Sequence, residues 1–538
     1  MKERVIKEQS LTQGAAVLLL STVLVKLIGA FFKIPLSSDI CLGDLGFGYF
    51  SFAYDIYTPV YTLALSGIPV AISKIISGFS LSEKADEADT ALKIFKRVLL
   101  ISGIAGFLLI LILTKPLVFV TDKTGKTAYS MLAMAPAVIF CCLSSVYRGY
   151  YEGCRNMTPT AVSNVIEALS KVLLGLTAAF VTVKLTGNAA FGAAAAMAGI
   201  SAGTVLSYLY LRFSFSKTYK FAEKKSVKTD KTLIKKLIII SLPIVFSSFA
   251  GSIVSFIDAV TVKWQLSGMM TDSFGTIAQM YQSTLSGDTL PTFLYGIRSK
   301  AFTLFNLIPT FTVSLGISAL PIISAAFVKG HRAEVEKSIN SVLKFSSVVA
   351  FPLAFGFMFV GTPIMSLLFG DTTAAIGGKM LCIYGIAALS AGLTMPLTAV
   401  LQALGKQNRA FLNFSVGLII KSAVNIILTA FPNINIFGAV IGTAACYVFV
   451  TFAHLVTLFK TGYKPEIKNT LLKPFLAAFA CGVTALLICR ISVSGIVTVA
   501  AIGAAAVVYL AVLIATKTFD RSDFTDFPLG KKLSKLIK

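Results

Sequence analysis

The chain has 538 residues, of which 56% are hydrophobic and only 13% are charged. Soluble domains carry about 25% charged residues, so this composition excludes a soluble globular protein and indicates a chain folded in lipid. The 48 basic and 24 acidic residues give a formal net charge of +24, and their placement, described below, argues against nucleic-acid binding.

Apolar runs of about 20 residues, long enough to cross a hydrocarbon core of about 30 Å, recur along the whole sequence. We expect fourteen membrane-spanning segments in chain order, at roughly residues 11–36, 46–76, 97–120, 127–150, 158–184, 189–212, 234–262, 296–326, 341–368, 377–403, 409–431, 435–459, 471–490 and 495–516. The second and eighth are long enough to be tilted or broken. Prolines also favour bending in the first, second and eighth segments. The predicted fold class is an all-α polytopic membrane protein.

Most lysines and arginines fall in the connections that lie on one side of the membrane if the amino terminus is cytoplasmic. The densest run, residues 212–236, joins the sixth and seventh segments. This is the positive-inside pattern of membrane proteins. We therefore expect a multi-pass protein of the cell membrane with both termini in the cytoplasm. Its basic loops would contact anionic membrane lipids and not nucleic acid.

The sequence contains an internal repeat. Three matches lie about 250 residues apart: 83–96 with 331–344, 153–156 with 405–408, and Lys171 with Lys421. Six expected helices separate the copies, so both copies have the same orientation in the membrane. This pattern is typical of transporters that rock two halves about a central site.

The repeat predicts two pseudo-symmetric six-helix lobes followed by two further helices. The expected divisions are an amino-terminal lobe (1–212), a basic cytoplasmic linker (213–236), a carboxy-terminal lobe (237–462), and the last two helices with a cytoplasmic tail (463–538).

Charged side chains within the apolar segments are the candidate functional residues. Each costs at least about 2.5–3.5 kcal/mol at mid-bilayer, so those present are expected to face a cavity or a partner. Lys26 and Lys421 have no neighbouring residue of opposite sign in the sequence. A cavity rich in such cations suits an anionic ligand, and pyrophosphate matches several lysine or arginine donors. The predicted substrate-binding residues are Lys26, Lys33, Arg298, Lys300 and Lys421.

Glu167 and Lys171 lie one helical turn apart in the fifth segment, with the acid first, which is the better order for such a pair. Two interpretations stay open: an internal clasp between helices, or a polar lining of a central cavity. Arg148 and Glu152 have the same spacing, but they lie near the membrane interface, where we expect an anchor. Asp55 and Asp258 are candidate acids for coupling to Na⁺ or H⁺.

The eight cysteines fall mostly inside apolar runs and include no CxxC pair. They are expected to act as small hydrophobic residues. Neither a disulfide framework nor a metal site is indicated, and no cofactor is expected.

Three stretches carry a resemblance to a known family: YRGYYEGCRNMTPTAVSNVIEALSKV (147–172), GISALPIISAAFVKGHRAEVE (316–336) and GIPVAISKIIS (67–77). They resemble the stage V sporulation protein B / polysaccharide biosynthesis family of Gram-positive bacteria. That family belongs to the multidrug/oligosaccharidyl-lipid/polysaccharide exporter superfamily and is more distantly similar to the flippase MurJ. The resemblance implies a two-lobed transporter that moves undecaprenyl-pyrophosphate-linked sugars, such as lipid II, from the inner to the outer leaflet.

The match to MurJ-like proteins is partial at the level of single residues. Lys26 and Gly29 match an Arg-x-x-Gly motif with lysine in place of arginine, and Lys33 lies one residue beyond the position of a second arginine. The cationic position of the second helix has no match, and that helix carries Asp55 instead. Arg298 and Lys300 are near the expected cation of the eighth helix but out of register. The last two helices resemble the pair that forms a groove for the lipid tail.

Two other classes of protein are alternatives to a lipid-linked sugar flippase. A Na⁺- or H⁺-coupled multidrug antiporter of the same superfamily is the nearest alternative, although Lys26 would repel a cationic drug. A polytopic glycosyltransferase or ligase would need acids and histidines clustered at one interface, whereas the longest expected external loop (263–295) has two acids and no histidine. The sequence therefore predicts a transporter and not an enzyme.

Overall fold

The structure is a computed structural model, and it describes residues 9, 11–62, 64, 68–80, 85–218, 256–492 and 494–519. These described residues contain helices and turns but no β-strand. Helices satisfy their own backbone hydrogen bonds, as a chain in lipid requires. The chain divides into two compact units, residues 1–296 and 297–538.

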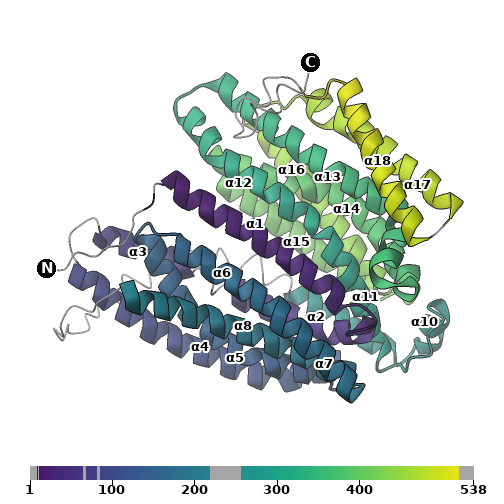
Figure 1. Cartoon of the computed structure of the whole chain (residues 1–538). Coiled ribbons are helices and arrows are strands. Elements are labelled where there is room, and N and C mark those ends of the chain that lie inside the picture. Colours follow the sequence, from purple (N-terminus) through teal and green to yellow (C-terminus); the bar gives the residue numbers. More distant parts are fainter. Residues whose placement is uncertain are drawn as a thin grey trace. The chain divides into compact units, whose positions relative to one another are not determined.

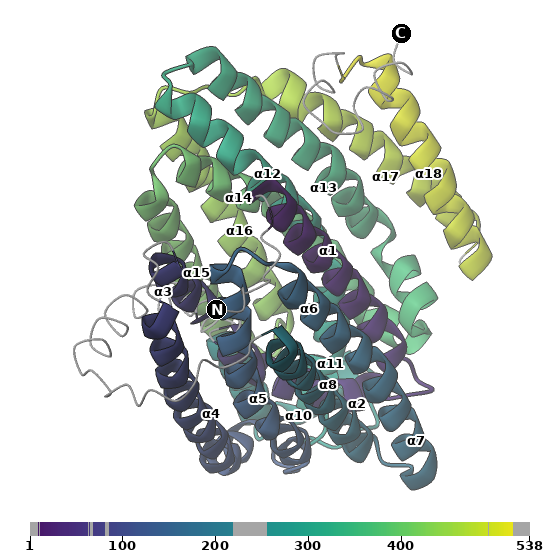
Figure 2. The same cartoon turned by 60° about the vertical axis from the view of Figure 1, so that its left-hand side comes forward.

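The amino-terminal unit contains helices α1 to α10 and the start of α11 (Figure 1). Their bounds are α1 (Leu11–Leu36), α2 (Gly43–Thr62), α3 (Ile68–Ser80), α4 (Ala85–Thr121), α5 (Thr127–Gly153), α6 (Thr158–Ser170), a π-helical turn (Lys171–Gly175), α7 (Leu176–Thr186), α8 (Ala189–Thr218), a helix at 256–269, and α10 (Phe274–Met280). Helix α5 packs between α4 and α8, and α6 packs on α8 and α1. Figures 1 and 2 both show α4, α5, α6 and α8 running side by side.

The carboxy-terminal unit contains the rest of α11 and the helices that follow it. Their bounds are α11 (Leu290–Phe305), α12 (Leu307–Val328), α13 (Arg332–Phe369), α14 (Asp371–Ala403), α15 (Gln407–Thr429), α16 (Phe437–Lys460), a second π-helical turn (Lys468–Leu472), α17 (Lys473–Ile491) and α18 (Gly495–Ala515). Helix α14 packs against α12, α13 and α16, and α15 packs against α16. Helices α17 and α18 form a hairpin against α13 at the edge of this unit (Figure 2).

Eleven helical spans in the described part of the chain are long and apolar enough to cross a membrane. The other three expected segments fall on α1, on α2 followed by α3, and on the helix at 256–269, whose preceding residues lie outside the described ranges. A total of fourteen is therefore compatible with the fold. The eighth expected segment is interrupted at Asn306, between α11 and α12. In the second, residues 63 and 65–67 lie outside the described ranges. The helix at 256–269 extends seven residues beyond its predicted end at 262, which shortens the expected external loop.

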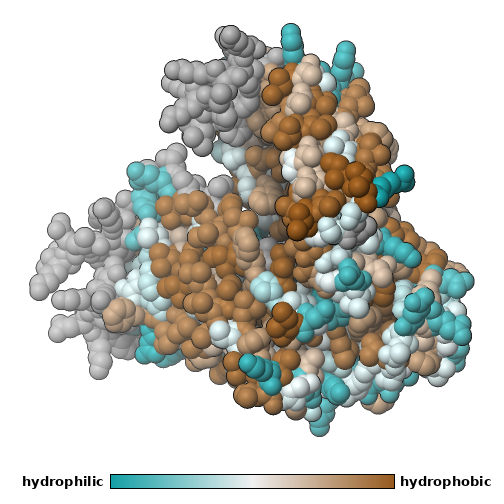
Figure 3. Space-filling model, turned by 45° about the vertical axis from the view of Figure 1, so that its right-hand side comes forward, coloured by the Kyte–Doolittle hydropathy of each residue, from teal (hydrophilic) through white to brown (hydrophobic). Residues whose placement is uncertain are grey.

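Large apolar side chains remain exposed on the outer helices. Examples are Leu109 and Ile112 on α4, and Val507 and Ile514 on α18. Figure 3 shows broad hydrophobic areas on the displayed face. Exposed apolar patches of this size are stable only against lipid or another apolar partner, so the protein is a multi-pass membrane protein.

The predicted division at 212, 236 and 462 stays a prediction. Residues 219–236 of the expected basic linker lie outside the described residues. The boundary between the two compact units falls within α11, after Gly296.

A buried ionic cluster as the candidate functional site

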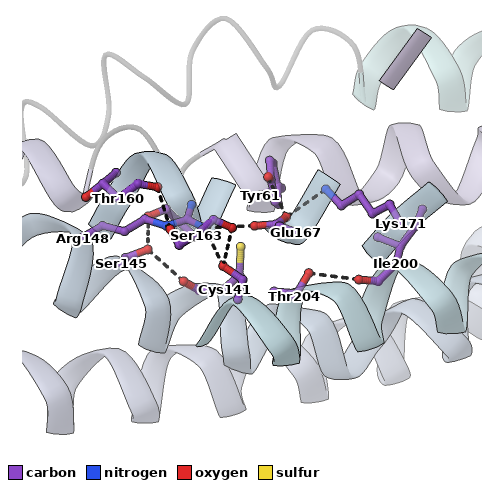
Figure 4. Close-up of polar contacts among 12 residues, drawn as sticks. Tyr61, Cys141, Ser145, Arg148, Thr160, Ser163, Glu167, Lys171, Ile200 and Thr204 are labelled. Carbon is purple, nitrogen blue, oxygen red and sulfur yellow. Dashed lines mark hydrogen bonds and ion pairs between the residues drawn. The ribbon is translucent and has the colours of Figure 1, made fainter. Parts of the chain in front are cut away.

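Glu167 on α6 lies at the centre of a buried ionic cluster in the amino-terminal unit (Figure 4). Its Oε1 lies 2.8 Å from Nζ of Lys171, and its Oε2 lies 3.0 Å from Nη2 of Arg148. The hydroxyl of Tyr61 donates a hydrogen bond of 2.8 Å to Oε1. The carboxylate is 3% exposed, and these three groups compensate for the hydration it has lost.

Arg148 is held by three helices. Its Nε donates to Oγ of Ser163 at 3.1 Å, and its Nη2 donates to Oγ of Ser207 at 3.0 Å. Ser207 in turn donates to the backbone oxygen of Ser163. The planar guanidinium therefore joins α5, α6 and α8 through bonds that the single ammonium of lysine could not all reproduce.

This position of Arg148 corrects the sequence analysis. The expected interfacial anchor is wrong, because Arg148 is 3% exposed and bound to Glu167. The four-residue spacing to Glu152 suggested a local pair. The partner is instead a residue of the next helix, which folds back along α5 and brings the two charges together.

Lys171 begins the π-helical turn Lys171–Gly175, four residues after Glu167 in the same span. Its ammonium lies 4.8 Å from the centre of the Tyr61 ring, a cation–π contact. The side chain is 17% exposed, more than those of Glu167 and Arg148, which are each 3% exposed. Single π-helical turns inside α-helices occur often at functional sites.

Close packing of α8 fixes the shape of this turn. A side chain at Gly199 would place its Cβ 2.4 Å from Cα of Gly175, and one at Gly203 would approach the backbone oxygen of Glu167 at 3.1 Å. Small residues allow helix backbones to approach in this way in membranes. The glycines of α8 therefore allow this helix to pack closely against α6 and the π-helical turn, next to the ionic cluster.

Among the groups in direct contact, two cations, Arg148 and Lys171, share the one carboxylate of Glu167. The Glu152 carboxyl attracts Arg148 electrostatically as well. Tyr54 on α2 extends this basic and aromatic region, because Lys33 of α1 lies 4.9 Å from the centre of its ring. Tyr54 and Tyr61 are seven residues apart and so share a face of α2. Tyr57 lies between them, with ring centres 6.4 Å from Tyr54 and 5.3 Å from Tyr61.

Lys26 is exposed on α1 and shares a face with Lys33, seven residues later. Seven helical residues span about 10 Å. The chain reverses direction between α1 and α2, so the step from Lys33 to Lys26 runs the same way as the step from Tyr54 to Tyr61. We therefore expect Lys26 to lie at about the same depth as Tyr61 and the ionic cluster.

The other predicted site residues have separate surroundings. Asp55 accepts a hydrogen bond of 2.6 Å from the hydroxyl of Tyr295, and Asp258 is buried in the helix at 256–269. In the carboxy-terminal unit, Lys300 is fully buried, 3.3 Å from Oγ1 of Thr373 and over the ring of Phe369. Arg298 lies over the ring of Phe302, and Lys421 is buried on α15.

Sequence reasoning also missed a buried cation in the amino-terminal unit. Lys263 is fully buried in the helix at 256–269, donates to Oγ1 of Thr127 at 3.1 Å and lies 4.5 Å from the ring centre of Phe52. Asp122, in the turn before α5, is close enough to attract it electrostatically. The predicted end of the segment at residue 262 placed Lys263 in a loop and hid this role.

The fold is that of a helical membrane protein that buries charged side chains within its apolar spans. Among solved structures, the chain is similar to a lipid II flippase MurJ in an inward closed conformation, with a TM-score of 0.67 and 16% identity over 92% of this chain and 97% of that one. It is also similar to an inward-facing multidrug resistance transporter of the MATE family, with a TM-score of 0.64 and 14% identity over 83% and 98% of the two chains. At these identities the likeness shows the fold alone.

Sequence comparison identifies the family. The family model described as polysaccharide biosynthesis protein matches residues 11–327, and the model described as lipid II flippase MurJ matches residues 303–515. The first match covers more than half of the chain, so the chain belongs to the polysaccharide biosynthesis protein family.

Two relatives from Bacillus subtilis (strain 168) match most of the chain. Stage V sporulation protein B is 28% identical over 470 residues, which are 84% of each protein. Lipid II flippase MurJ is 24% identical over 494 residues, which are 87% of this chain and 86% of the relative.

Proposed function

We propose that this protein flips undecaprenyl-pyrophosphate-linked cell-wall or polysaccharide precursors, of the lipid II kind, from the inner to the outer leaflet by alternating access. The observation that carries the proposal is the excess of cations over carboxylates deep in the amino-terminal unit, where Arg148 and Lys171 share Glu167. Membership of the polysaccharide biosynthesis protein family and the match to the MurJ family model support this choice of substrate.

In this proposal Lys26 and Lys33 bind the pyrophosphate first, because both lie on one face of α1 and Lys26 is exposed. Lysine binds phosphate as a point charge and not as a rigid fork, so recognition would depend on charge more than on exact geometry. The partly exposed Lys171 provides the next cation along the tyrosine-bearing face of α2. Tyr54 and Tyr61 offer ring surface beside these cations.

Arg298, Lys300 and Lys421 of the carboxy-terminal unit remain proposed substrate-binding residues. Lys300 is packed against Thr373 and Phe369, so its contact with substrate would require a conformation in which this packing opens. Asp55 and Asp258 remain proposed coupling acids for Na⁺ or H⁺. The same proposal places both termini in the cytoplasm and treats residues 1–212 and 237–462 as the two moving lobes.

A multidrug antiporter is the rival proposal, and the cluster disfavours it. Glu167, an acid that could attract a cationic drug, is bound by two cations and a tyrosine hydroxyl. Asp55 is bound by Tyr295. A cation would have to displace these partners, whereas an anion meets the excess positive charge directly.

The proposal is tested by a leaflet assay in sealed proteoliposomes. Lipid II is loaded in both leaflets, and the fraction accessible to an enzyme that cannot cross the membrane is followed over time. We expect the wild-type chain to expose lipid II from the inner leaflet, and Lys26→Ala to slow this by at least about tenfold, the effect of losing about 1.4 kcal/mol of interaction. Lys184→Ala removes an exposed lysine at the end of α7 and serves as the matched control.

Two results would contradict the proposal. Full transport by folded Lys26→Ala protein would remove Lys26 from the substrate site. Absence of lipid II movement by the wild type, together with Na⁺- or H⁺-coupled efflux of a cationic dye, would favour the antiporter.

A further inference from the structure

A second polar cluster surrounds His454 in the carboxy-terminal unit. His454 is fully buried on α16, inside the apolar span Phe437–Lys460. Its Nε2 lies 2.9 Å from Oγ1 of Thr398 on α14, and its Nδ1 lies 3.2 Å from Nδ2 of Asn413 on α15. Asn413 Nδ2 also donates to Oγ1 of Thr457 at 3.0 Å. The imidazole is therefore held by three helices.

These partners select one uncharged form of the ring. The side-chain nitrogen of Asn413 can only donate, so Nδ1 of His454 accepts and Nε2 carries the hydrogen. Thr398 uses its own hydroxyl hydrogen on the backbone oxygen of Thr394 at 2.8 Å, and its oxygen can accept from Nε2. A proton added at Nδ1 would face the amide hydrogens of Asn413. The amide would then have to turn its oxygen to the ring and release Thr457.

The charges around His454 do not compensate for a protonated ring. Helices α15 and α16 contain no aspartate or glutamate, and the only acid of α14 is Asp371 at its first residue. The charged residues of α15 are Arg409, one turn before Asn413, and Lys421, two turns after it. Lys460 ends α16, and Lys379 lies five turns before Thr398 on α14. A proton on His454 would therefore be an uncompensated buried charge, which is costly, and would favour a conformation that hydrates the ring.

The two clusters occupy corresponding places in the internal repeat. Three positions of the first cluster have counterparts 250 residues later in the second: Arg148 and Thr398, Ser163 and Asn413, Ser207 and Thr457. The central residues do not correspond, because Glu167 is matched by Gly417 and His454 by Thr204. The helices correspond as well, since α5, α6 and α8 carry the first set and α14, α15 and α16 the second. Gly192 and Gly442, also 250 apart, both mark close approaches to the preceding helix.

The repeat thus holds one three-helix polar junction in each unit, and the two differ in charge. In the amino-terminal junction a fixed cation, Arg148, is balanced by Glu167. In the carboxy-terminal junction, Thr398 and Asn413 are joined by hydrogen bonds to the ring of His454. Histidine is the side chain whose ordinary titration range spans physiological pH.

We infer that His454 is a proton-binding site of the transport cycle, in addition to the proposed coupling acids, and that its protonation at Nδ1 releases the Thr398–Asn413–Thr457 junction and so favours a different conformation of the carboxy-terminal unit. The ligand is a proton, taken up from water on one side of the membrane and returned on the other. The coupling to lipid movement rests on the proposed function, whereas proton binding at His454 does not.

Proton binding can be observed directly because the chain has only two histidines. The second, His331, is exposed between α12 and α13. In full-length protein with ¹⁵N-labelled histidine, His331→Asn leaves the signals of His454 alone. We expect the neutral Nε2–H form at about pH 8, and protonation at Nδ1 on acidification to about pH 5. An Nδ1–H form, or a ring that stays neutral throughout, would overturn the inference.

Coupling is tested in the leaflet assay with an imposed pH gradient. We expect the gradient to change the wild-type rate several-fold, His331→Asn to respond like the wild type, and His454→Gln to lose the response. An unchanged response of folded His454→Gln protein would overturn the inference. If that variant does not fold, Asn413→Asp provides the second test, since a carboxylate at Nδ1 would stabilise the charged ring and should move the pH response toward neutral pH. Failure of lipid II movement at every pH would contradict the proposed function, while the histidine signals would still decide whether the proton binds.

Discussion

Glu167 holds two cations from different helices, and this arrangement has a large expected effect on stability. Removing one member of a buried ion pair leaves the remaining charge uncompensated and costs about 3–5 kcal/mol. Here the loss of the carboxylate would leave both Arg148 and Lys171 buried without their acid. The same group sets the local charge that a substrate anion would meet.

We therefore expect Glu167→Gln to lower the thermal stability of the purified protein strongly, by the equivalent of about 3–5 kcal/mol. Glu336→Gln is the matched control, because Glu336 also pairs with an arginine at 3.0 Å but is exposed on α13. That change should cost no more than about 1 kcal/mol. Thermal unfolding in detergent measures both, and equal effects of the two changes would show that the cluster is not a buried ionic unit.

Asp122 makes the stability of the turn before α5 depend on pH. Burial by itself raises the pKa of Asp122, but the Lys263 ammonium and hydrogen bonds from Thr127 and Thr124 outweigh it and hold this pKa below its usual value. A lowered folded-state pKa adds stability at pH values above that of the unfolded chain, about 3.9. This stability is lost as the pH falls through the folded-state pKa.

We expect the unfolding temperature of the wild type to fall more steeply between about pH 5 and pH 3 than that of Asp122→Asn. At neutral pH the variant should be the less stable of the two, because it cannot attract Lys263. Asp272→Asn, at an exposed position, should follow the wild-type curve. A wild-type curve parallel to that of Asp122→Asn would contradict the assigned contacts.

At the scale of helices, the site depends on how closely α8 approaches the π-helical turn. Gly199 lies against the backbone of Gly175 and Leu174, so an added methyl group meets main-chain atoms that cannot move aside cheaply. Close approach also explains why the ionic cluster lies between α5, α6 and α8 and not at a surface.

Gly199→Ala is expected to push α8 away from the π-helical turn, to destabilise the protein by about 1–3 kcal/mol through overpacking, and to lower lipid II movement. Gly503→Ala on α18, where a new methyl group meets nothing within 4 Å, should be neutral or slightly stabilising because alanine favours helix. Thermal unfolding and the leaflet assay report the two effects. Unchanged stability of Gly199→Ala would mean that the helices can separate without cost.

The sequence predicts the helical architecture from the length of its apolar runs. It also predicts the pairing of Glu167 with Lys171, because that pairing depends only on helical spacing. Arg148, Tyr61 and Ser207 could not be assigned in this way. Their contacts join different helices and so do not follow from spacing along one helix; Tyr61 and Glu167, for example, are 106 residues apart. The buried position of Lys263 was hidden because an apolar pattern defines the ends of a segment only to within several residues.

At the scale of the whole molecule, the internal repeat links the fold to the proposed mechanism. The two polar junctions use the same helix positions, yet one is ionic and the other can take up a proton. A transporter with two similar units needs such a difference if one unit is to bind the anionic headgroup while the other responds to the ion gradient. The spacing of 250 residues was visible in the sequence at Lys171 and Lys421, but the junctions were not, because serine, threonine and asparagine are common in membrane helices for other reasons.

Orientation in the membrane is a separate prediction at this scale. With a cytoplasmic amino terminus, the turn between α1 and α2 is external and the turn between α14 and α15 is internal. Asp39→Cys should therefore react with an impermeant thiol reagent in intact cells, whereas Lys406→Cys should react only after lysis; both positions are exposed. The reverse pattern would contradict the orientation and with it the direction of transport.

We propose that the amino-terminal cations recognise a pyrophosphate on a lipid carrier. A comparison of diphosphate-linked and monophosphate-linked lipids tests this recognition. Wild-type proteoliposomes are loaded with the same undecaprenyl-linked sugar joined through either a diphosphate or a monophosphate, and movement between leaflets is followed for both. We expect the diphosphate lipid to move faster, by about tenfold for each 1.4 kcal/mol of added interaction. Lys26→Ala should remove much of this difference. Equal rates for the two lipids, or movement of neither, would contradict this proposal.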